Sequence, residues 1–271
     1  MYLSRHEILQ QPRWALDGRL LPADFKLGEM LQIPQATLAP FLQGLPSGEP
    51  ATGRLLAPIE ATQEVWAAGV TYRRSREARE AESEIRDVYE KVYSAERPEL
   101  FFKASGWRTV GHRSPIRIRR DATWHVPEPE LTLVANSRGE IVGFCVGDDV
   151  SSRDIEGANP LYLPQAKVFN GSCALGPGIE IANADDLTDL PIAAEIERNG
   201  ITVFEGMTRT SQIKRSFPEL VGFLRRELDF PNGVFLMTGT GIVPPDDFTL
   251  QPGDVVRITV ASLTLENEVR V

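Results

Sequence analysis

Residues 124–134 read WHVPEPELTLV, and the second half of this stretch alternates like a β-strand. Successive side chains of a strand point to opposite faces, so Glu128 and Glu130 share one face while Leu131 and Leu133 point toward a core. Two carboxylates about 7 Å apart on one face repel each other unless a positive charge lies between them. The stretch therefore predicts a strand that carries either a site for a hard divalent cation or a solvated acidic surface.

The next strand supplies a third acidic side chain. Residues 140–154 read EIVGFCVGDDVSSRD, in which Asp149 continues the face formed by small residues at alternate positions before it. These small residues leave room beside the neighbouring strand, so Asp149 can converge on Glu128 and Glu130. Asp148 then faces the other side, although a β-bulge would exchange the two. The three histidines of the chain show no metal-ligand spacing, which favours carboxylate ligands.

Two later segments contain polar residues in apolar surroundings. Lys167 is the single lysine of residues 159–177, NPLYLPQAKVFNGSCALGP. Such a lysine either extends to water or, held near an anion, acts as a proton donor or acceptor. Residues 235–245, FLMTGTGIVPP, place Thr238 and Thr240 in a turn interrupted by glycines. This turn either offers hydroxyl and backbone N–H groups to a carboxylate or is only a tight strand end.

The rest of the chain predicts a mostly β fold with some α-helix. From residue 100 onward, short runs of alternating or β-branched residues are separated by Gly, Pro and Asp turns. We expect a buried strand at 64–72, helices at 75–96 and 216–228, and a terminal hairpin within 252–271. Residues 1–60 are rich in proline and are expected to form a small, irregular N-terminal domain that contains short strand-like pieces. Residues 61–271 are expected to form the catalytic domain.

The bulk composition excludes several classes of protein. The 271 residues are 42% hydrophobic and 25% charged, as in an ordinary globular protein. The formal net charge of −9 argues against a nucleic-acid-binding surface. No apolar run approaches the ~20 residues that span a bilayer, and the N-terminus lacks a signal-peptide core. Cys145 and Cys173 are expected to be buried thiols, so the sequence predicts a cytoplasmic protein without membrane partners.

The chain resembles the fumarylacetoacetate hydrolase family over residues 65–265. The resemblance implies a mixed β-sandwich roll, assembled as a homodimer or homotetramer. It also implies a Mg²⁺ site, or one for Mn²⁺ or Ca²⁺, with Glu128, Glu130 and Asp149 as ligands. Lys167 takes the place of the pocket lysine, and Thr238 that of a carboxylate-binding threonine. Five motifs carry the resemblance in this order: PEPEL (127–131), GDDVSSRD (147–154), PQAKVF (164–169), CALGP (173–177) and LMTGTG (236–241).

Within this family the sequence is most similar to dehydratases of 2-keto-3-deoxy pentonates. The resemblance implies that Glu99 is an acid/base residue beside the metal. Hydrolases of the family carry a Tyr-Arg-x-His-x-x-Glu stretch whose His and Glu activate water. Ser75 and Ala78 occupy those two positions here, which argues against C–C hydrolysis. Three segments carry this similarity: VYEKVYSAERPELFFK (88–103), DVSSRDIEGANPLYLPQAK (149–167) and GSCALGP (171–177).

The expected reaction is dehydration of a small 2-keto acid, a 2-keto-3-deoxy pentonate, to 2,5-dioxopentanoate through a metal-stabilised enolate. Lys167 and Glu99 are the expected acid/base pair, in either assignment of roles. Arg73 and Lys167 are expected to offset the negative charge of the site, and Thr238 and Thr240 to contact substrate. One alternative is a hydrolase or decarboxylase of acylpyruvates or oxaloacetate-like acids at the same metal site. Another is a sugar-acid-binding protein without activity.

Overall fold

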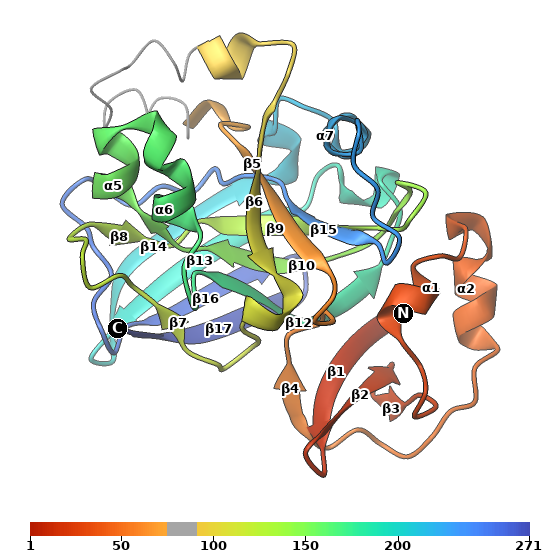
Figure 1. The fold of residues 1–271 in the computed structure, drawn as a ribbon. Helices are drawn as coiled ribbons and strands as arrows, with labels where there is room; N and C mark the ends of the chain where they lie inside the picture. The colour runs from red at the N-terminus through yellow and green to blue at the C-terminus, as the bar shows by residue number, and fades with distance from the viewer. Residues whose placement is uncertain (75–90) are drawn as a thin grey trace.

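The computed structural model describes residues 1–74 and 91–271 as two large β-sheets with short helices at their edges (Figure 1). The larger sheet has ten strands in the order β3-β2-β1-β12-β10-β9-β15-β5-β6, with β4 paired to β1. These strands are β1 (Tyr2–Ile8), β2 (Gln11–Leu16), β3 (Arg19–Leu20), β4 (Arg54–Leu56), β5 (Glu64–Gly69), β6 (Glu99–Ser105), β9 (Pro129–Ala135), β10 (Ile141–Asp149), β12 (Cys173–Ile181) and β15 (Val234–Met237).

The second large sheet has five strands in the order β14-β13-β16-β17-β7, and a small sheet pairs β11 with β8. The strands of the two sheets are β7 (Ile116–Arg117), β8 (His125–Val126), β11 (Ser151–Ser152), β13 (Pro191–Arg198), β14 (Ile201–Arg209), β16 (Val255–Val260) and β17 (Leu263–Arg270). Most pairs are antiparallel, but β15 runs parallel to β5 and β17 parallel to β7. The expected mostly β fold with mixed sheets is confirmed, as is the hairpin formed by β16 and β17.

Hydrophobic side chains cover both faces of the larger sheet. One cluster fills the space between the two large sheets, where Leu131 and Leu133 of β9 meet residues of β13, β16 and β17. A second cluster lies on the opposite face of the larger sheet and includes Val134, Cys145 and many side chains from the first 60 residues. Side chains at odd and even positions of β9 therefore enter different hydrophobic clusters, which agrees with the strand-like alternation of residues 124–134.

The N-terminal residues are more regular than expected. β1 and β2 form a hairpin, and β1 also pairs with β12, where Leu3 lies opposite Ile179. Helices α1 (Leu27–Met30) and α2 (Gln35–Gln43) follow the hairpin. The first 60 residues therefore extend the same sheet that contains β9 and β10 (Figure 1). The division into domains at residue 60 stays a prediction.

The remaining helices lie at the ends of strands. The helix expected at 216–228 is confirmed in its first part as α7 (Phe217–Leu224), whose first turn is capped by the Ser216 hydroxyl, which accepts a hydrogen bond from the Glu219 N–H. The helix expected at 75–96 falls largely outside the described residues, and of the part that is described, residues 91–94 are helical. The other described helices are α5 (Arg153–Ala158) and α6 (Leu163–Lys167), with 3₁₀ turns at Gly106–Arg108, Pro160–Tyr162, Asp185–Leu187 and Thr210–Gln212.

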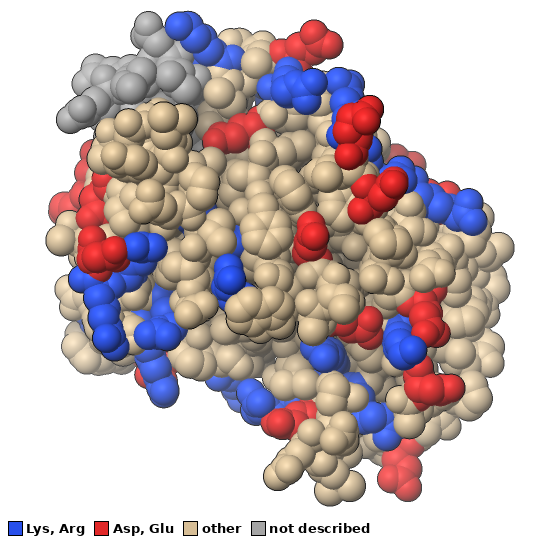
Figure 2. Space-filling model, in the orientation of Figure 1, with Lys and Arg blue, Asp and Glu red and all other residues tan. Residues whose placement is uncertain are grey.

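Charged side chains of both signs are interspersed on the face of the molecule shown in Figure 2. This mixture contains no continuous basic surface among the residues described on that face, in keeping with the net charge of −9. A nucleic-acid-binding face would need clustered Lys and Arg. Within residues 1–74 and 91–271, no helix is both long and apolar enough to cross a membrane.

Candidate active site

Three buried carboxylates meet where β9 and β10 lie side by side. Glu128 immediately precedes β9, Glu130 lies within it, and Asp149 ends β10. The strand pairing explains their convergence, because Gly147 lies opposite Glu130 and the Asp149 N–H donates to the Glu128 carbonyl at 3.1 Å. One oxygen from each carboxylate lies within 4.8 Å of the others. The structure thus brings together the three residues that the sequence nominated as metal ligands.

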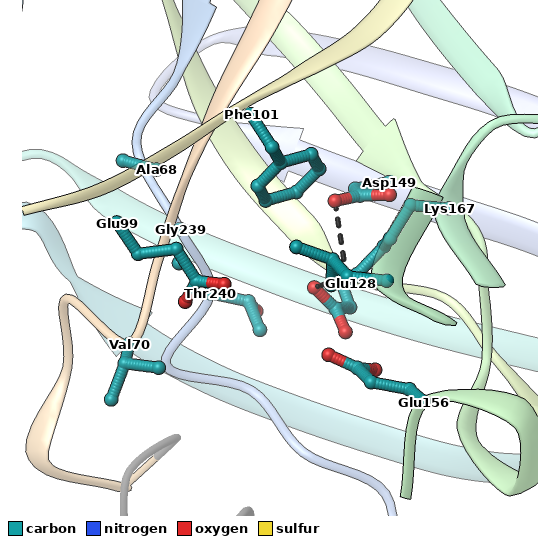
Figure 3. Close-up of a pocket in the computed structure, with 12 residues that line it drawn as sticks. Ala68, Val70, Glu99, Phe101, Glu128, Asp149, Glu156, Lys167, Gly239 and Thr240 are labelled. Atoms are coloured by element: carbon teal, nitrogen blue, oxygen red, sulfur yellow. Dashed lines mark hydrogen bonds and ion pairs between the residues drawn. The ribbon is translucent and has the colours of Figure 1, made fainter. Parts of the chain in front are cut away.

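Lys167 joins this group from the last residue of α6. Its Nζ lies 2.7 Å from Glu128 Oε2 and 3.1 Å from Asp149 Oδ2. The same Nζ donates a hydrogen bond to the Ser151 hydroxyl at 2.7 Å. Figure 3 shows the lysine directed toward Glu128 and Asp149 at one side of the cavity. An ammonium in this position is a charged donor held beside the carboxylates, and it does not extend to water.

Two further cations that the sequence analysis missed contact the same carboxylates. Lys103 of β6 is fully buried, forms an ion pair with Asp149 Oδ1, and donates to the backbone carbonyls of Val150 at 3.1 Å and Lys167 at 2.5 Å. The guanidinium of Arg153 lies 3.2 Å from Glu128 Oε1. Each carboxylate oxygen of Glu128 and of Asp149 is therefore contacted by a basic side chain. No local sequence pattern indicated Lys103, whose ion-pair partner Asp149 lies in a different strand.

The donor set fits a hard divalent cation such as Mg²⁺. Its ligand atoms are carboxylate oxygens, which such ions prefer. Burial raises the pKa of Glu130 well above its ordinary value, and repulsion from Asp149 and Glu128 adds to the increase. A cation among the three carboxylates would relieve that repulsion and favour the ionised form. These contacts make the cluster chemically suited to a divalent ion.

A glycine turn holds Glu130 from the other side. The Gly239 N–H donates to Glu130 Oε2 at 2.5 Å, and Gly239 has a φ of +90°. A Cβ at this position would lie 2.0 Å from the Thr71 hydroxyl oxygen, which itself donates to the Thr238 carbonyl at 2.6 Å. Only glycine combines this backbone conformation with so close a neighbour. The turn therefore fixes an N–H group against one candidate ligand.

The predicted substrate-binding residues fall in different environments. The Thr238 hydroxyl is fully buried and donates to the Leu131 carbonyl at 3.0 Å, so it contributes to holding the turn. Thr240 lines the cavity, and its hydroxyl lies 3.2 Å from the Ile242 carbonyl. Arg73 is exposed and is not one of the described residues that line the cavity. The roles proposed for these three residues remain predictions.

Two more carboxylates face the cavity beside the cluster. Figure 3 shows Glu99 from β6 and Glu156 from α5 directed into it from different sides. The Glu99 side chain has room to point into the cavity because Gly69, the residue opposite it on β5, has no side chain. A Cβ at Gly69 would lie 2.1 Å from Glu99 Oε2. Glu99 was predicted from the sequence, whereas Glu156 was not. Glu156 lies three residues after Arg153 on the same inward side of α5. The described residues of the cavity wall are Ala68, Gly69, Val70, Glu99, Phe101, Glu128, Asp149, Glu156, Leu163, Lys167, Gly239 and Thr240.

Asp148 lies next to the cluster but in a different setting, and it gives a testable pH dependence. Its Oδ1 accepts a hydrogen bond from the Glu128 N–H at 3.1 Å, while burial raises its pKa to about 8 from an ordinary 3.8. At a pH between these two values, Asp148 is protonated in the folded chain and ionised in the unfolded chain. The free energy of unfolding therefore falls as the pH rises toward 8.

We expect Asp148→Asn, which resembles the protonated acid, to be less sensitive to pH than the wild type. The free energy of unfolding of the variant should exceed that of the wild type at pH 8 by at least about 1 kcal/mol, because one pKa unit corresponds to ~1.4 kcal/mol. Urea unfolding at pH 5 and pH 8 in EDTA measures the difference. Equal pH dependences for the two proteins would show that Asp148 does not hold this proton.

Comparison with known proteins places the chain in a family. Residues 64–270 match the fumarylacetoacetate (FAA) hydrolase C-terminal domain. The chain belongs to the fumarylacetoacetate hydrolase family. A probable 2-keto-3-deoxyxylonate dehydratase of Haloferax volcanii is 49% identical over 214 residues, covering 78% of this chain and 73% of that protein. A 2-dehydro-3-deoxy-D-arabinonate dehydratase of Saccharolobus solfataricus is 42% identical over 217 residues, covering 78% and 72%.

Solved structures of the fumarylacetoacetate hydrolase family agree with this assignment. A 2-keto-3-deoxy-D-arabinonate dehydratase complexed with magnesium and 2,5-dioxopentanoate superposes with a TM-score of 0.83 at 34% identity, covering 100% of this chain and 99% of that one. Its apo form gives a TM-score of 0.84 at the same identity and coverage. The resemblance found in the sequence, to this family and its dehydratase branch, is confirmed. Ser75 and Ala78, at the positions of the hydrolases' His and Glu, lie outside the described residues.

Proposed function

We propose that this protein is a hydro-lyase that dehydrates a 2-keto-3-deoxy pentonate to 2,5-dioxopentanoate, with Mg²⁺ held by Glu128, Glu130 and Asp149. The observation that carries the proposal is one cavity lined by two candidate acid/base groups, Glu99 and Lys167, together with the carboxylate cluster. The dehydratase names of the relatives at 49% and 42% identity support the reaction class and the substrate. The magnesium complex of a homologous dehydratase supports the choice of ion.

A bound divalent cation would polarise the carboxylate and keto oxygens of the substrate and so acidify its C3 protons. The side chains then have to move two protons. One of Lys167 and Glu99 accepts a C3 proton, and the other donates a proton to the C4 hydroxyl, which departs as water. Transfer of a proton from C5 to C3 converts the resulting enone to an enol with a C4=C5 double bond. Movement of the C5 hydroxyl proton to C4 then gives the aldehyde. The net change is the loss of one water molecule, and no attacking water is required.

The charges around the cluster suit an anionic substrate. Glu128, Glu130 and Asp149 contribute three negative charges, while Lys103, Lys167 and Arg153 contribute three positive charges in contact with them. A divalent cation would therefore leave the immediate surroundings positive, and a keto acid with one carboxylate would be attracted to them. Lys103 and Arg153, in addition to Lys167, thus offset the negative charge of the three carboxylates.

The deciding experiment is an assay of the purified protein with 2-keto-3-deoxy-D-arabinonate and Mg²⁺, coupled to a semialdehyde dehydrogenase. We expect reduction of NADP⁺ that requires both the protein and the metal and that stops when EDTA is added. Restoring Mg²⁺ after EDTA should restore the rate, which separates metal removal from denaturation. Pyruvate release from acylpyruvates or oxaloacetate, with no semialdehyde formed, would instead indicate the hydrolase or decarboxylase alternative. A homodimer or homotetramer and a cytoplasmic location stay predictions from the sequence.

A further inference from the structure

Glu156 is a buried acidic side chain of the cavity to which the proposed reaction gives no part. It lies on α5, is 4% exposed, and points into the cavity beside Glu128 (Figure 3). Glu99 faces the same space from β6. Arg153, one helical turn before Glu156, points inward as well, and its guanidinium contacts Glu128. The helix therefore directs the cation of Arg153 to the carboxylate cluster and the carboxylate of Glu156 to the cavity.

The described wall of the cavity has an uneven distribution of charge. Lys167 is the one basic side chain among the described lining residues, and its Nζ contacts Glu128, Asp149 and Ser151. The positive charge of the described wall thus lies beside Glu128 and Asp149, within the carboxylate cluster. The part of the wall formed by Glu99 and Glu156 is acidic, with Phe101 and Leu163 as apolar neighbours.

We propose that Glu156 is a specificity-determining residue that accepts hydrogen bonds from the hydroxyl-bearing end of the substrate and excludes 2-keto acids with a second carboxylate. The inference rests on the proposed function, in which the keto-acid end is bound at the carboxylate cluster. The other end of a five-carbon acid then lies beside Glu99 and Glu156. A carboxylate accepts hydrogen bonds from hydroxyl groups, but it repels a second carboxylate at short range. The uncharged aldehyde end of 2,5-dioxopentanoate would not be repelled by this wall.

Two five-carbon acids that lack the C4 hydroxyl test the charge preference without turnover. 2-Oxopentanoate has an uncharged tail, and 2-oxoglutarate carries a carboxylate at the corresponding end. Isothermal titration calorimetry with the Mg²⁺-loaded protein should show that the wild type binds 2-oxoglutarate at least about tenfold more weakly than 2-oxopentanoate. Equal affinities in the wild type would overturn the proposal before any variant is made.

Glu156→Gln keeps the shape of the side chain and removes its charge. We expect the ratio of the two dissociation constants to fall by about tenfold in this variant. Glu205→Gln, at an exposed position of β14 outside the described cavity wall, makes the same change in net charge and should leave the ratio as in the wild type. A ratio that is unchanged in Glu156→Gln, or equally changed in Glu205→Gln, would contradict the proposal.

The two proposals can fail independently. If Glu156→Gln does not fold, Glu156→Ala provides a second charge-free variant for the same ratio. Because neither test acid can lose water from C4, the ratio can be measured even if the dehydratase assay is negative. Dehydratase activity with an unchanged ratio would refute only the role of Glu156. A changed ratio without dehydratase activity would support this charge selection and refute the proposed reaction.

Discussion

Replacing Lys167 with Met is expected to lower kcat by about 100- to 10,000-fold, the usual range for removing a positioned acid or base. Lys167 Nζ lies 2.7 Å from Glu128 Oε2 and in the same cavity as Glu99. Methionine has a similar length but cannot carry a proton. The semialdehyde assay at saturating Mg²⁺ and substrate measures the change. Glu99→Gln should give a loss of comparable size, since the second proton transfer would then lack its group.

Two controls separate proton transfer from damage to the site. Each variant should keep the circular dichroism spectrum of the wild type, and Glu99→Gln should keep its Mg²⁺ affinity because Glu99 is not one of the proposed ligands. Lys26→Met provides a lysine replacement at an exposed ion pair, 65% exposed, and should leave kcat unchanged. Near-wild-type turnover in both Lys167→Met and Glu99→Gln would refute the proposed acid/base roles.

Replacing Lys103 with Met is expected to reduce the free energy of unfolding by about 3–5 kcal/mol, the usual cost of removing one member of a buried ion pair. Lys103 is fully buried, pairs with Asp149, and satisfies the carbonyls of Val150 and Lys167. Methionine would leave both carbonyls without this donor and Asp149 without one of its two lysines. Urea unfolding in EDTA measures the effect without a contribution from bound metal.

A double variant shows whether the loss arises from the charge on Asp149. Asp149→Asn together with Lys103→Met should be more stable than the sum of the two single changes predicts, because no unpaired carboxylate remains. The exposed variant Lys26→Met should change the unfolding midpoint little, since its partner Glu29 is in water. Additive effects of the two buried changes would show that the stabilisation by Lys103 comes only from its backbone hydrogen bonds.

The carboxylate cluster could be predicted because it depends on local periodicity. Alternation along one strand put Glu128 and Glu130 on one face, and the small residues of the next strand left room for Asp149. Lys103 could not be found in this way, because its partners lie 46 and more residues later in the chain. A lysine within a strand normally extends its ammonium to water, so nothing local indicated full burial. Tertiary packing determines that burial.

Glu156 shows a related limit. The short segment around it has no long apolar period, so the sequence did not indicate which side of the helix faces inward. Short strand-like pieces were expected in the first 60 residues, but the frequent prolines suggested an irregular module and gave no sign of a hairpin within the large sheet. Those prolines fall largely outside the strands, and Pro12 sits in β2 near the start of the strand.

The pairing of β1 with β12 affects the order in which parts of the chain can fold during synthesis. The hairpin of β1 and β2 involves residues 2–16, whereas the partner strand β12 spans Cys173–Ile181. During synthesis the hairpin leaves the ribosome long before the strand that completes its sheet. Until then its apolar side chains, among them Leu3 and Trp14, lack the second core that later covers them. The apolar side chains of this N-terminal hairpin therefore stay uncovered through most of translation, until residues 173–181 have been made.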